Sequence, residues 1–332
     1  MNANENILLI RLKSIGDILF TLPSVHLVRQ SFPGARITFL VSREYAPLLE
    51  GFRDVDAVIA LDRAVFRRRH PAAIVKETVS LLRRLRRAKF SLAIDFQGYG
   101  ETALLTWWSG APQRWGSVYA PGRKWAYTQG VERARNLHPA ERSLRLLQQC
   151  GLRLTGVRNQ FALSDGALDE ARRFFLAQGL DPARPTLFIQ PLTSTSSKNW
   201  PLDRSLAAAR FWQRRGLQVI FGGGPAEQAA LEPVRREGFP VSAGAPLLVN
   251  AGLMKLSTLV LGGDTGLVHL AVAMDKRVVM INRSVGSSFP FQHQDWAVTP
   301  PPGKPVSVIP EDRIIGACAR ALAELGVGSQ SA

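Results

Sequence analysis

The sequence predicts an α/β protein made of two domains, each built on a mainly parallel sheet with helices on both faces. Short apolar runs of strand length alternate with amphipathic runs of helix length over nearly the whole chain. This pattern restarts after a polar stretch at residues 155–159, which indicates a boundary there. A chain of 332 residues also suits two domains of ordinary size better than one core. We therefore expect one domain over residues 1–160 and a second over residues 161–332.

In the first half, four apolar runs are candidate strands and amphipathic runs are candidate helices. The predicted strands are residues 7–11, 36–41, 57–61 and 91–95. The predicted helices include residues 18–31, 72–88 and 139–150. Because ligands bind open α/β sheets at the carboxyl ends of the strands, the polar residues directly after each strand are candidate site residues.

The second half repeats the pattern. Its predicted strands are residues 186–190, 218–221, 258–262 and 277–281. Its predicted helices are residues 168–178, 202–215, 227–236, 266–274 and 311–325. A stiff, proline-rich loop at residues 300–305 is expected to precede a last strand and the last helix. The sequence leaves open whether that helix packs on its own half or returns to the N-terminal domain.

The composition excludes several classes of protein. Hydrophobic residues make up 46% of the chain and charged residues 20%, which is typical of a packed globular protein and not of a disordered chain or a fibre. No run approaches the roughly 20 apolar residues of a membrane span. The N-terminal apolar run follows an acidic residue, so it resembles a strand more than a signal peptide. Cys150 and Cys318 lack metal-ligand spacing, and we expect reduced thiols in a cytoplasmic protein.

The net charge of +16 is concentrated in the first half of the chain. Residues 1–160 carry 25 Lys and Arg against 12 Asp and Glu, whereas residues 161–332 carry 17 against 14. Such a one-sided basic field attracts polyanions: a nucleic acid, an anionic membrane or a phosphorylated acceptor. Charge alone does not choose among them, but the sequence lacks the aromatic-basic motifs of the usual nucleic-acid-binding modules.

The first candidate motif runs from Arg11 to Asp17, directly after the first predicted strand. Gly16 can turn the chain tightly, and Asp17 then opens a helix. As a structural residue, Asp17 is an N-cap that accepts bonds from free backbone N–H groups, and the pattern alone favours this role. As a functional residue, it is a carboxylate at the mouth of the sheet that can act as a general base.

Two further motifs follow strands of the second half. The loop from Gln190 to Pro201 offers hydroxyl groups, backbone N–H groups and Lys198 ahead of a helix, which suits a phosphate cradle but also a polar surface loop. The run from Gly222 to Gly224 lets a ligand approach the backbone, and Glu227 can then bind a ribose. A flexible turn with a helix-start glutamate explains this second string equally simply.

The most specific motif is the ten-residue string from Gly262 to Ala271. A strand ends at two glycines, and Asp264, Thr265 and Gly266 then open a helix that has His269 in its first turn. Free N–H groups and the helix dipole create an anion site at such a position. Ordinary caps and a hydrogen-bonded structural histidine are the alternative, yet the string as a whole favours function.

Two other features resemble functional motifs, but each also has a simple structural explanation. Asp54 and Asp56 match the acidic pair of metal-dependent glycosyltransferases, but they precede a strand, whereas that role requires a loop after one. The basic stretch at residues 63–89 is a solvated helix face in most proteins. Its only acidic residue is Glu77, so it can instead face a polyanion.

Taken together, these strings resemble glycosyltransferase family 9, the heptosyltransferases of lipopolysaccharide core synthesis. The resemblance covers nearly the whole chain through five separated motifs. These are Arg11 to Asp17 with Pro23, Asp95 to Gly98, Thr193 to Trp200, Gly224 to Glu227, and Gly263 to Ala271. It implies a GT-B fold, in which two Rossmann-like domains with mainly parallel sheets face a central cleft, and inverting sugar transfer without a metal or another cofactor.

The resemblance also implies roles for individual residues. Asp17 matches the catalytic base, and Lys198 matches a group that stabilises the leaving diphosphate. The donor, usually ADP-heptose, is held by the C-terminal domain through residues that match Thr193, Ser194, Lys198, Glu227, Asp264, Thr265, Gly266 and His269. The acceptor, an anionic glycolipid of the lipopolysaccharide core, is held by the N-terminal domain. We assign acceptor contacts to Gln97 and to the arginines Arg67, Arg68 and Arg69.

One departure and two alternatives stand beside this interpretation. First heptosyltransferases of the family tend to have a lysine soon after the Asp-x-Gln-Gly string, where this chain has Tyr99, Gly100 and Glu101. The exact acceptor and sugar therefore stay open. A GT-B-fold sugar-nucleotide epimerase would share the donor site without needing a basic half. A non-catalytic sugar-nucleotide-binding protein is the other alternative.

The basic first half also predicts a peripheral position on the anionic inner face of the inner membrane.

Overall fold

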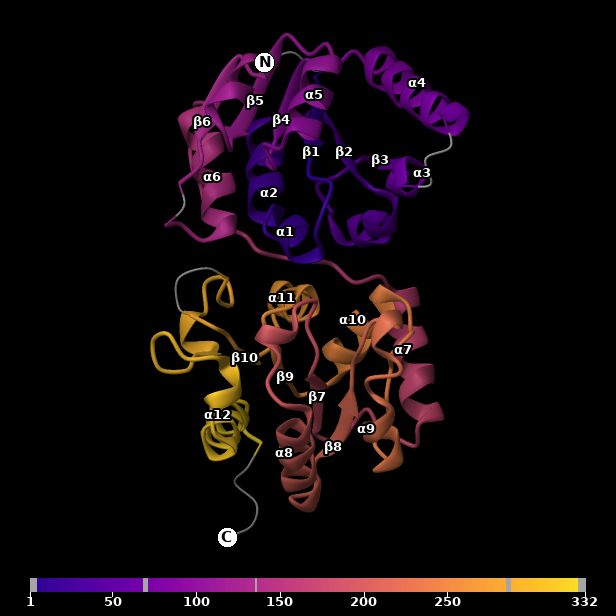
Figure 1. The fold of residues 1–332 in the computed structure, drawn as a ribbon, viewed down its shortest axis with the longest axis vertical. Coiled ribbons are helices and arrows are strands. Elements are labelled where there is room, and N and C mark those ends of the chain that lie inside the picture. Colours follow the sequence, from indigo (N-terminus) through magenta and orange to yellow (C-terminus); the bar gives the residue numbers. More distant parts are fainter. Residues whose placement is uncertain (1–4, 68–70, 135, 285–287, 328–332) are drawn as a thin grey trace. The chain divides into compact units, whose positions relative to one another are not determined.

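A computed structural model describes residues 5–67, 71–134, 136–284 and 288–327 of the chain (Figure 1). The chain divides into two compact units, Met1–Gln160 and Phe161–Ala332, called here the first and second unit. Each unit has one parallel sheet with helices packed against it, as the alternating pattern of the sequence predicts. Within the described ranges, no helix has the length and apolar character needed to cross a bilayer.

The first unit is built on a six-stranded sheet with the strand order β3-β2-β1-β4-β5-β6. Its strands are β1 (Asn6–Ile10), β2 (Arg36–Ser42), β3 (Ala57–Leu61), β4 (Leu92–Asp95), β5 (Gln113–Val118) and β6 (Gln129–Glu132). All neighbouring strands are parallel. The order reverses between β1 and β4, and such a reversal leaves a crevice at the carboxyl ends of the two strands.

Helices cover both faces of this sheet and bury its central strands. They are α1 (Ile15–Leu19), α2 (Leu22–Ser31), α3 (Arg63–Arg67), α4 (Pro71–Arg87), α5 (Gly100–Trp108) and α6 (Pro139–Gln149), with the 3-10 turns η1 (Arg43–Gly51) and η2 (Pro121–Ala126). The continuous apolar run of β1 is typical of a strand with both faces covered, and its residues 7–10 are fully buried. The amphipathic α4 turns Leu81 and Leu85 inward and leaves its arginines exposed.

The second unit has a five-stranded sheet with the order β11-β10-β9-β7-β8. Its strands are β7 (Thr186–Gln190), β8 (Gln218–Phe221), β9 (Leu259–Gly263), β10 (Val278–Ile281) and β11 (Ala297–Val298), and all of its pairs are parallel. Counted within the unit, this is the doubly wound order 2-1-3-4-5, whose reversal lies between β7 and β9. The second crevice is therefore expected beyond the ends of these two strands.

The helices of the second unit are α7 (Asp165–Ala177), α8 (Leu202–Arg214), α9 (Glu232–Arg236), α10 (Leu247–Leu256), α11 (Gly266–Ala273) and α12 (Glu311–Glu324). The last helix, α12, packs against α8, β9 and β10 of its own unit. Its buried face, which includes Ile314 and Cys318, joins a core made by alternate residues of the sheet and by Trp200 and Trp212.

The predicted strands agree with the structure, but the edges of both sheets differ from the prediction. β5 and β6 were not predicted, because Gly116 and Gly130 interrupt their apolar pattern. The strand expected after residues 300–305 is wrong, since Val306–Val308 forms a 3-10 turn and β11 precedes the prolines. The helix expected over residues 227–236 is shorter and begins only at Glu232.

The contact between α7 and α10 depends on Gly252. A Cβ atom added at Gly252 would lie 2.5 Å from the Cβ of Ala171 and 3.0 Å from the carbonyl oxygen of Ala167. The two helices thus approach so closely that only a hydrogen fits between them. This contact positions α10, which leads into β9 and so to the second crevice.

We predict that Gly252→Ala lowers the free energy of unfolding by about 1–3 kcal/mol, because overpacking outweighs the better helix propensity of alanine. The matched control is Gly166→Ala in α7, where an added Cβ meets nothing within 4 Å. This control should be neutral or slightly stabilising. Denaturant melts of the two variants and the wild type measure the difference. Equal stabilities of the two variants would contradict the packing argument.

Candidate functional site

The crevice of the first unit holds Asp17 between the ends of β1 and β4. Arg11 pairs with it, since an Nη2 of Arg11 lies 2.8 Å from Oδ1 of Asp17. The other Nη of Arg11 donates to the carbonyl oxygen of Phe96, directly after β4, at 2.9 Å. Arg11 therefore joins the two strand ends and fixes one carboxylate oxygen of Asp17. The Asp17 side chain keeps 39% of its surface exposed, so a ligand can reach it.

The N-cap of α1 is Ser14, and Asp17 is the third residue of the helix. The structural interpretation of Asp17 as an N-cap is thus wrong in position. Its Oδ2 accepts a hydrogen bond from the Ser14 hydroxyl at 3.3 Å and lies 3.5 Å from the Ser14 backbone nitrogen, the reciprocal contact of a capping box. These bonds are long, so Oδ2 is held weakly and stays available as a proton acceptor.

Asp95, a buried carboxylate at the end of β4, orders the turn beside this crevice. Its Oδ1 accepts the backbone N–H groups of Gln97 and Gly98 at 2.8 and 2.9 Å, and its Oδ2 accepts the Tyr127 hydroxyl at 2.7 Å. Burial raises the pKa of Asp95, although the hydrogen bonds from Gly98, Tyr127 and Gln97 oppose that shift. The three bonds shape the turn after β4 that carries Gln97.

Gln97, assigned above to acceptor binding, lies at the strand switch of the first unit. Its Oε1 accepts the backbone N–H of Leu12 at 2.9 Å, which ties the turn after β4 to the end of β1. Among the described residues, its buried amide nitrogen has no hydrogen-bond partner. Gly98, with φ at +72°, takes the left-handed conformation that completes this turn, and a Cβ there would collide with the Ser117 carbonyl.

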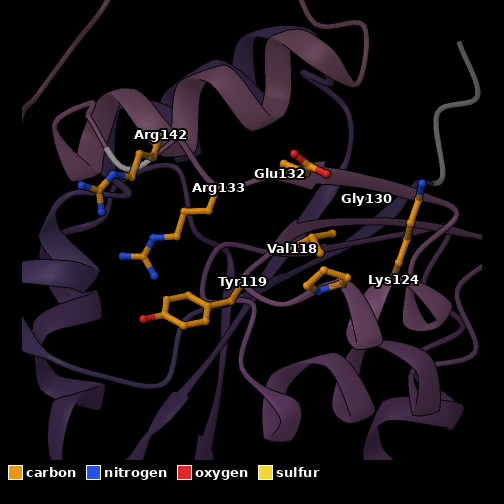
Figure 2. A pocket seen from close by; sticks show the side chains of 8 residues that line it. Val118, Tyr119, Lys124, Gly130, Glu132, Arg133 and Arg142 are labelled. Carbon is orange, nitrogen blue, oxygen red and sulfur yellow. The ribbon is translucent and has the colours of Figure 1, made fainter.

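A pocket of the first unit has a volume of about 750 Å³ (Figure 2). It is lined by Val118, Tyr119, Pro121, Lys124, Gly130, Glu132, Arg133 and Arg142. In Figure 2, Arg133, Arg142 and Tyr119 gather at one side, and the Arg133 guanidinium lies 4.9 Å from the centre of the Tyr119 ring. Burial, and then the charges of Arg133 and Arg11, lower the pKa of Arg142. Desolvated guanidinium groups of this kind suit an anionic ligand.

This pocket reaches Asp17 through shared walls. A small recess next to it is lined by Arg11 and Asp17 together with the same Arg133 and Arg142. The carboxylate of Asp17 and the basic pocket thus belong to one continuous surface of the first unit. The analysis of the sequence missed Arg133, Arg142, Tyr119 and Lys124. Arg133 directly follows β6 and Tyr119 directly follows β5, so recognising these two strands would have pointed to both residues.

In the second unit, Asp264 joins three side chains at the end of β9. The Lys198 ammonium lies 2.7 Å from Oδ2 of Asp264, and the Ser288 hydroxyl donates to the same oxygen at 2.8 Å. Nε2 of His269 lies 2.9 Å from Oδ1. The loop after β7 and the first turn of α11 are therefore held together through one carboxylate, as the resemblance groups them.

The electrostatic balance of this group follows from its partners. Burial alone would raise the pKa of Asp264. The hydrogen bond and charge of His269, followed by those of Lys198, outweigh burial and hold the pKa of Asp264 well below its usual value. Asp264 is buried, whereas 36% of the Lys198 side chain is exposed. Lys198 is thus a partly exposed cation beside the N-terminus of α11, which carries a partial positive charge of its own.

The loops around this group are positioned by small residues. Thr265 is the N-cap of α11 and accepts the backbone N–H of Val268 at 3.3 Å, so the alternative role as a cap is correct for it. A Cβ at Gly263 would lie 2.7 Å from Cγ2 of Thr193, so glycine lets the β7 loop come close. The Thr193 hydroxyl donates to the Thr195 carbonyl at 2.8 Å, and Ser194 is exposed on the same loop.

Glu227 lies in the turn after β8 and has structural partners. Its Oε2 accepts the backbone N–H of Gly224 at 2.7 Å and lies 3.4 Å from the Nε2 of Gln190. Gln190, at the end of β7, opens the loop motif recognised in the sequence but was given no role of its own. Its buried Oε1 has no hydrogen-bond partner among the described residues, and a Cβ at Gly222 would lie 2.7 Å from that oxygen. The glycines of this turn therefore accommodate Gln190.

The structure describes the acidic pair Asp54 and Asp56, but it does not describe all of the arginines assigned to the acceptor. Asp54 pairs with His26 at 2.9 Å, and Asp56 pairs with Arg29 at 2.6 Å. Among the described residues, no group of three His, Cys, Asp or Glu side chains is arranged to hold a metal ion. Arg68, Arg69 and the side chain of Arg67, assigned above to the acceptor, lie outside the described residues.

Comparison with known proteins identifies the family of this arrangement. The model of glycosyltransferase family 9 (heptosyltransferase) matches residues 78–286, which is more than half of the chain. The match includes the Gln97 turn, the Lys198 loop and the Asp264 group, and Asp17 precedes it. Lipopolysaccharide heptosyltransferase 3 of Escherichia coli K12 is 23% identical over 279 residues, which cover 80% of this chain and 79% of that protein.

Solved structures share the fold over almost the full length. The glycosyl transferase family 9 structure from Veillonella parvula DSM 2008 has a TM-score of 0.87 and 20% identity, and the similarity covers 96% of this chain and 97% of that one. The Escherichia coli heptosyltransferase WaaC with ADP has a TM-score of 0.78 and 20% identity, covering 95% and 99%. The predicted GT-B class, with two Rossmann-like units on parallel sheets, is thereby confirmed.

We predict a pH-dependent contribution of Asp264 to stability. Because the folded-state pKa is depressed, the stabilisation is present above the ordinary pKa of 3.8 and is lost as pH falls through the folded value. Asp264→Asn should cost about 1.5–3 kcal/mol near neutral pH, the worth of hydrogen bonds to charged groups. Denaturant melts at neutral pH and at several values below about 4 test this.

The wild type and Asp264→Asn should converge in stability as the pH falls. Asp169→Asn is the control, because Asp169 makes an exposed pair with Arg172, 2.9 Å apart, and exposed pairs contribute little. A gap between wild type and Asp264→Asn that stays constant from neutral to acid pH would show that the ionised carboxylate is not the stabilising group.

Proposed function

Since the chain belongs to glycosyltransferase family 9, the heptosyltransferases, we propose that it moves a sugar, heptose from ADP-heptose, onto an anionic acceptor of the lipopolysaccharide core. The observation that carries the proposal is the pair of polar crevices at the two strand switches. One holds an exposed carboxylate beside a basic pocket, and the other holds a cation beside a helix N-terminus. The first suits an acceptor that must lose a proton, and the second suits a departing diphosphate.

The donor side is assigned to the second unit, residues 161–332. The ammonium of Lys198 and the free N–H groups of Thr265 and Gly266 at the start of α11 can take the diphosphate oxygens. Asp264, held by His269, keeps Lys198 at this place, so these two act as positioning residues. Thr193, Ser194 and Glu227 complete the assigned donor contacts. The nucleotide is proposed as ADP because the similar WaaC structure contains ADP.

The acceptor side is assigned to the first unit, residues 1–160. Asp17 takes the proton from the attacking hydroxyl, because its side chain is partly exposed and its Oδ2 is only weakly held. The pocket around Arg133 and Arg142 then receives carboxylate or phosphate groups of the acceptor. Gln97 orders the floor of this site, and the arginines at positions 67–69 are kept as further acceptor contacts.

The proposed reaction inverts the anomeric centre and needs no metal. The acceptor oxygen attacks the anomeric carbon from the face opposite the diphosphate while its proton passes to Asp17. As the bond between that carbon and the diphosphate oxygen breaks, negative charge grows on the leaving group. Lys198 and the N-terminus of α11 stabilise that charge, which is the role that a metal ion has in other transferases.

Two other functions remain as alternatives that one experiment separates. An epimerase would use the donor crevice alone, and a binding protein would turn over nothing. The basic pocket beside Asp17 favours a transferase, because neither alternative needs an anionic acceptor site. Incubation with a panel of ADP- and UDP-sugars, with and without an anionic glycolipid acceptor, distinguishes them. Epimerised sugar nucleotide without acceptor-dependent release of nucleoside diphosphate would favour the epimerase.

The place of action is proposed from the charge of the first unit. An anionic acceptor carried by a lipid lies on an anionic membrane leaflet, and a surface with an excess of arginine is attracted to it. We therefore propose that the protein is cytoplasmic and binds peripherally to the inner face of the inner membrane.

We predict that Asp17→Asn lowers kcat roughly 10²–10⁴-fold, the usual worth of a general base. The KM for the donor should change little, since Asp17 belongs to the acceptor side. Steady-state kinetics of nucleoside diphosphate release measure both constants. The matched control is Asp203→Asn, which removes a first-turn acidic residue from α8 instead of α1. Near-normal turnover of Asp17→Asn would reduce Asp17 to a helix-capping residue.

We predict that Lys198→Ala slows transfer on the order of 10²–10³-fold, as the loss of a charge stabiliser does elsewhere. Lys198→Arg should restore part of the rate, because it keeps the charge beside Asp264. Transfer should also survive EDTA in wild type. A strict requirement for added Mg²⁺ or Mn²⁺ would contradict the proposed leaving-group stabilisation.

A further inference from the structure

Four large aromatic side chains are exposed along α5 and η2 of the first unit. The Trp107 and Trp125 rings contact each other edge to face, 6.0 Å apart, and 44% and 57% of these residues is exposed. Tyr99 and Tyr119 form a second such pair, 5.4 Å apart, and both are exposed. These four residues are called the aromatic face below. Tyr99 directly precedes α5, and α5 and η2 pack against each other, so both pairs belong to the same part of the first unit.

Exposure of this kind calls for a partner. Each tryptophan is among the largest apolar side chains, and the protein leaves two of them in contact at its surface. A contiguous apolar patch on a folded chain commonly marks an interaction surface. The ring of tryptophan is also amphipathic, since its N–H group can face water while its body is buried in an apolar phase.

The surroundings of the tryptophan pair are basic. Lys124 is exposed next to Trp125, and Arg123 precedes it in η2. The Arg86 guanidinium lies against Gly110 at the end of α5, since a Cβ there would be 2.7 Å from its Nη1. The nearest acidic residue on α5 is Glu101, and it is already paired with Arg63 at 3.0 Å. Glu132 lines the same pocket as Lys124, but Arg86, Arg123 and Lys124 outnumber it, so the net charge of this region is positive.

We propose that the aromatic face docks the protein on an anionic phospholipid bilayer, with Trp107 and Trp125 entering the headgroup region. Tryptophan concentrates at this depth of a membrane, and lysine and arginine beside it attract anionic lipids. The proposal rests on the proposed transfer to a lipid-borne acceptor and specifies the surface that makes contact. A second copy of the chain fits less well, because a symmetric interface would bring two copies of this positively charged region together.

The aromatic face is also continuous with the acceptor pocket. Tyr119 and Lys124 line that pocket, and Trp125 directly follows Lys124 (Figure 2). The Arg133 guanidinium stacks on Tyr119 from the pocket side. A glycolipid whose chains remain in the bilayer can thus present its anionic sugars to Arg133 while Trp107 and Trp125 rest among the headgroups. Docking brings the pocket to the surface on which the acceptor is displayed.

The test is co-sedimentation of the full chain with vesicles of phosphatidylcholine and phosphatidylglycerol, compared with pure phosphatidylcholine. The affinity of the double variant Trp107→Ser/Trp125→Ser for the anionic vesicles should be at least roughly tenfold lower than that of the wild type, because most of the apolar contact is removed. Arg86→Ala should weaken binding about fivefold at low salt and less at moderate salt. The matched controls Leu176→Ser and Arg236→Ala, both exposed on the second unit, should bind as wild type.

Each result decides the proposal. The proposal is overturned if the Trp107→Ser/Trp125→Ser variant binds as well as the wild type. It is also overturned if the single variants Trp125→Ser and Arg86→Ala both bind as well as the wild type. Equal binding of wild type to both kinds of vesicle overturns the basic part of it. A double variant that binds normally but turns a dimer into a monomer in light scattering assigns the face to a second copy instead. The vesicles contain neither donor nor acceptor, so failed docking leaves the transferase proposal to the Asp17 and Lys198 variants.

Discussion

The reversal of strand order in each parallel sheet is the constraint on which the rest of the molecule depends. Where neighbouring strands send the chain to opposite faces, their carboxyl ends leave a crevice lined by loops. In the first unit this crevice opens between β1 and β4, and its exposed backbone groups must be satisfied. Gln97 takes the N–H of Leu12 and Asp95 takes those of Gln97 and Gly98, so the floor is rigid before any ligand arrives.

In the second unit, a carboxylate instead binds side chains from neighbouring segments of the chain. Asp264 stands at the end of β9 and binds a lysine from the β7 loop and a histidine from α11. A buried carboxylate is unfavourable unless it is paired, and here the pairing fixes Lys198 beside the N-terminus of α11. The ion pair that stabilises the loop therefore also keeps a cation ready for an anion. Two Rossmann-like units thus carry opposite sites: a carboxylate in one and a cation in the other.

The sequence predicted the parts of the fold that depend on apolar pattern and missed those that depend on a neighbouring side chain. The central strands are continuous apolar runs, so their positions along the chain and the loops after them were accessible. β5 escaped because it contains Gly116, and that glycine is there because the Tyr127 ring crosses the strand to reach Asp95. No local pattern reveals such a crossing. Arg133 and Arg142 were missed for the same reason, since they follow or face the unrecognised edge strands.

The first unit carries 25 Lys and Arg against 12 Asp and Glu, so most of its basic side chains have no acidic residue to balance them. Among the described residues of this unit, ion pairs with acidic side chains are made by Arg11, Arg29, Arg43 and Arg63. The arginines of α4 include Arg83 and Arg87, one helical turn apart, and like charges at this spacing destabilise a helix. Exposed charges stabilise a fold little even when paired, so this excess is a cost to the folded chain alone. Under the proposed function, an anionic acceptor in the pocket and an anionic surface beside it would turn this cost into binding free energy, which would link the acceptor side of the reaction to the place where the acceptor is found.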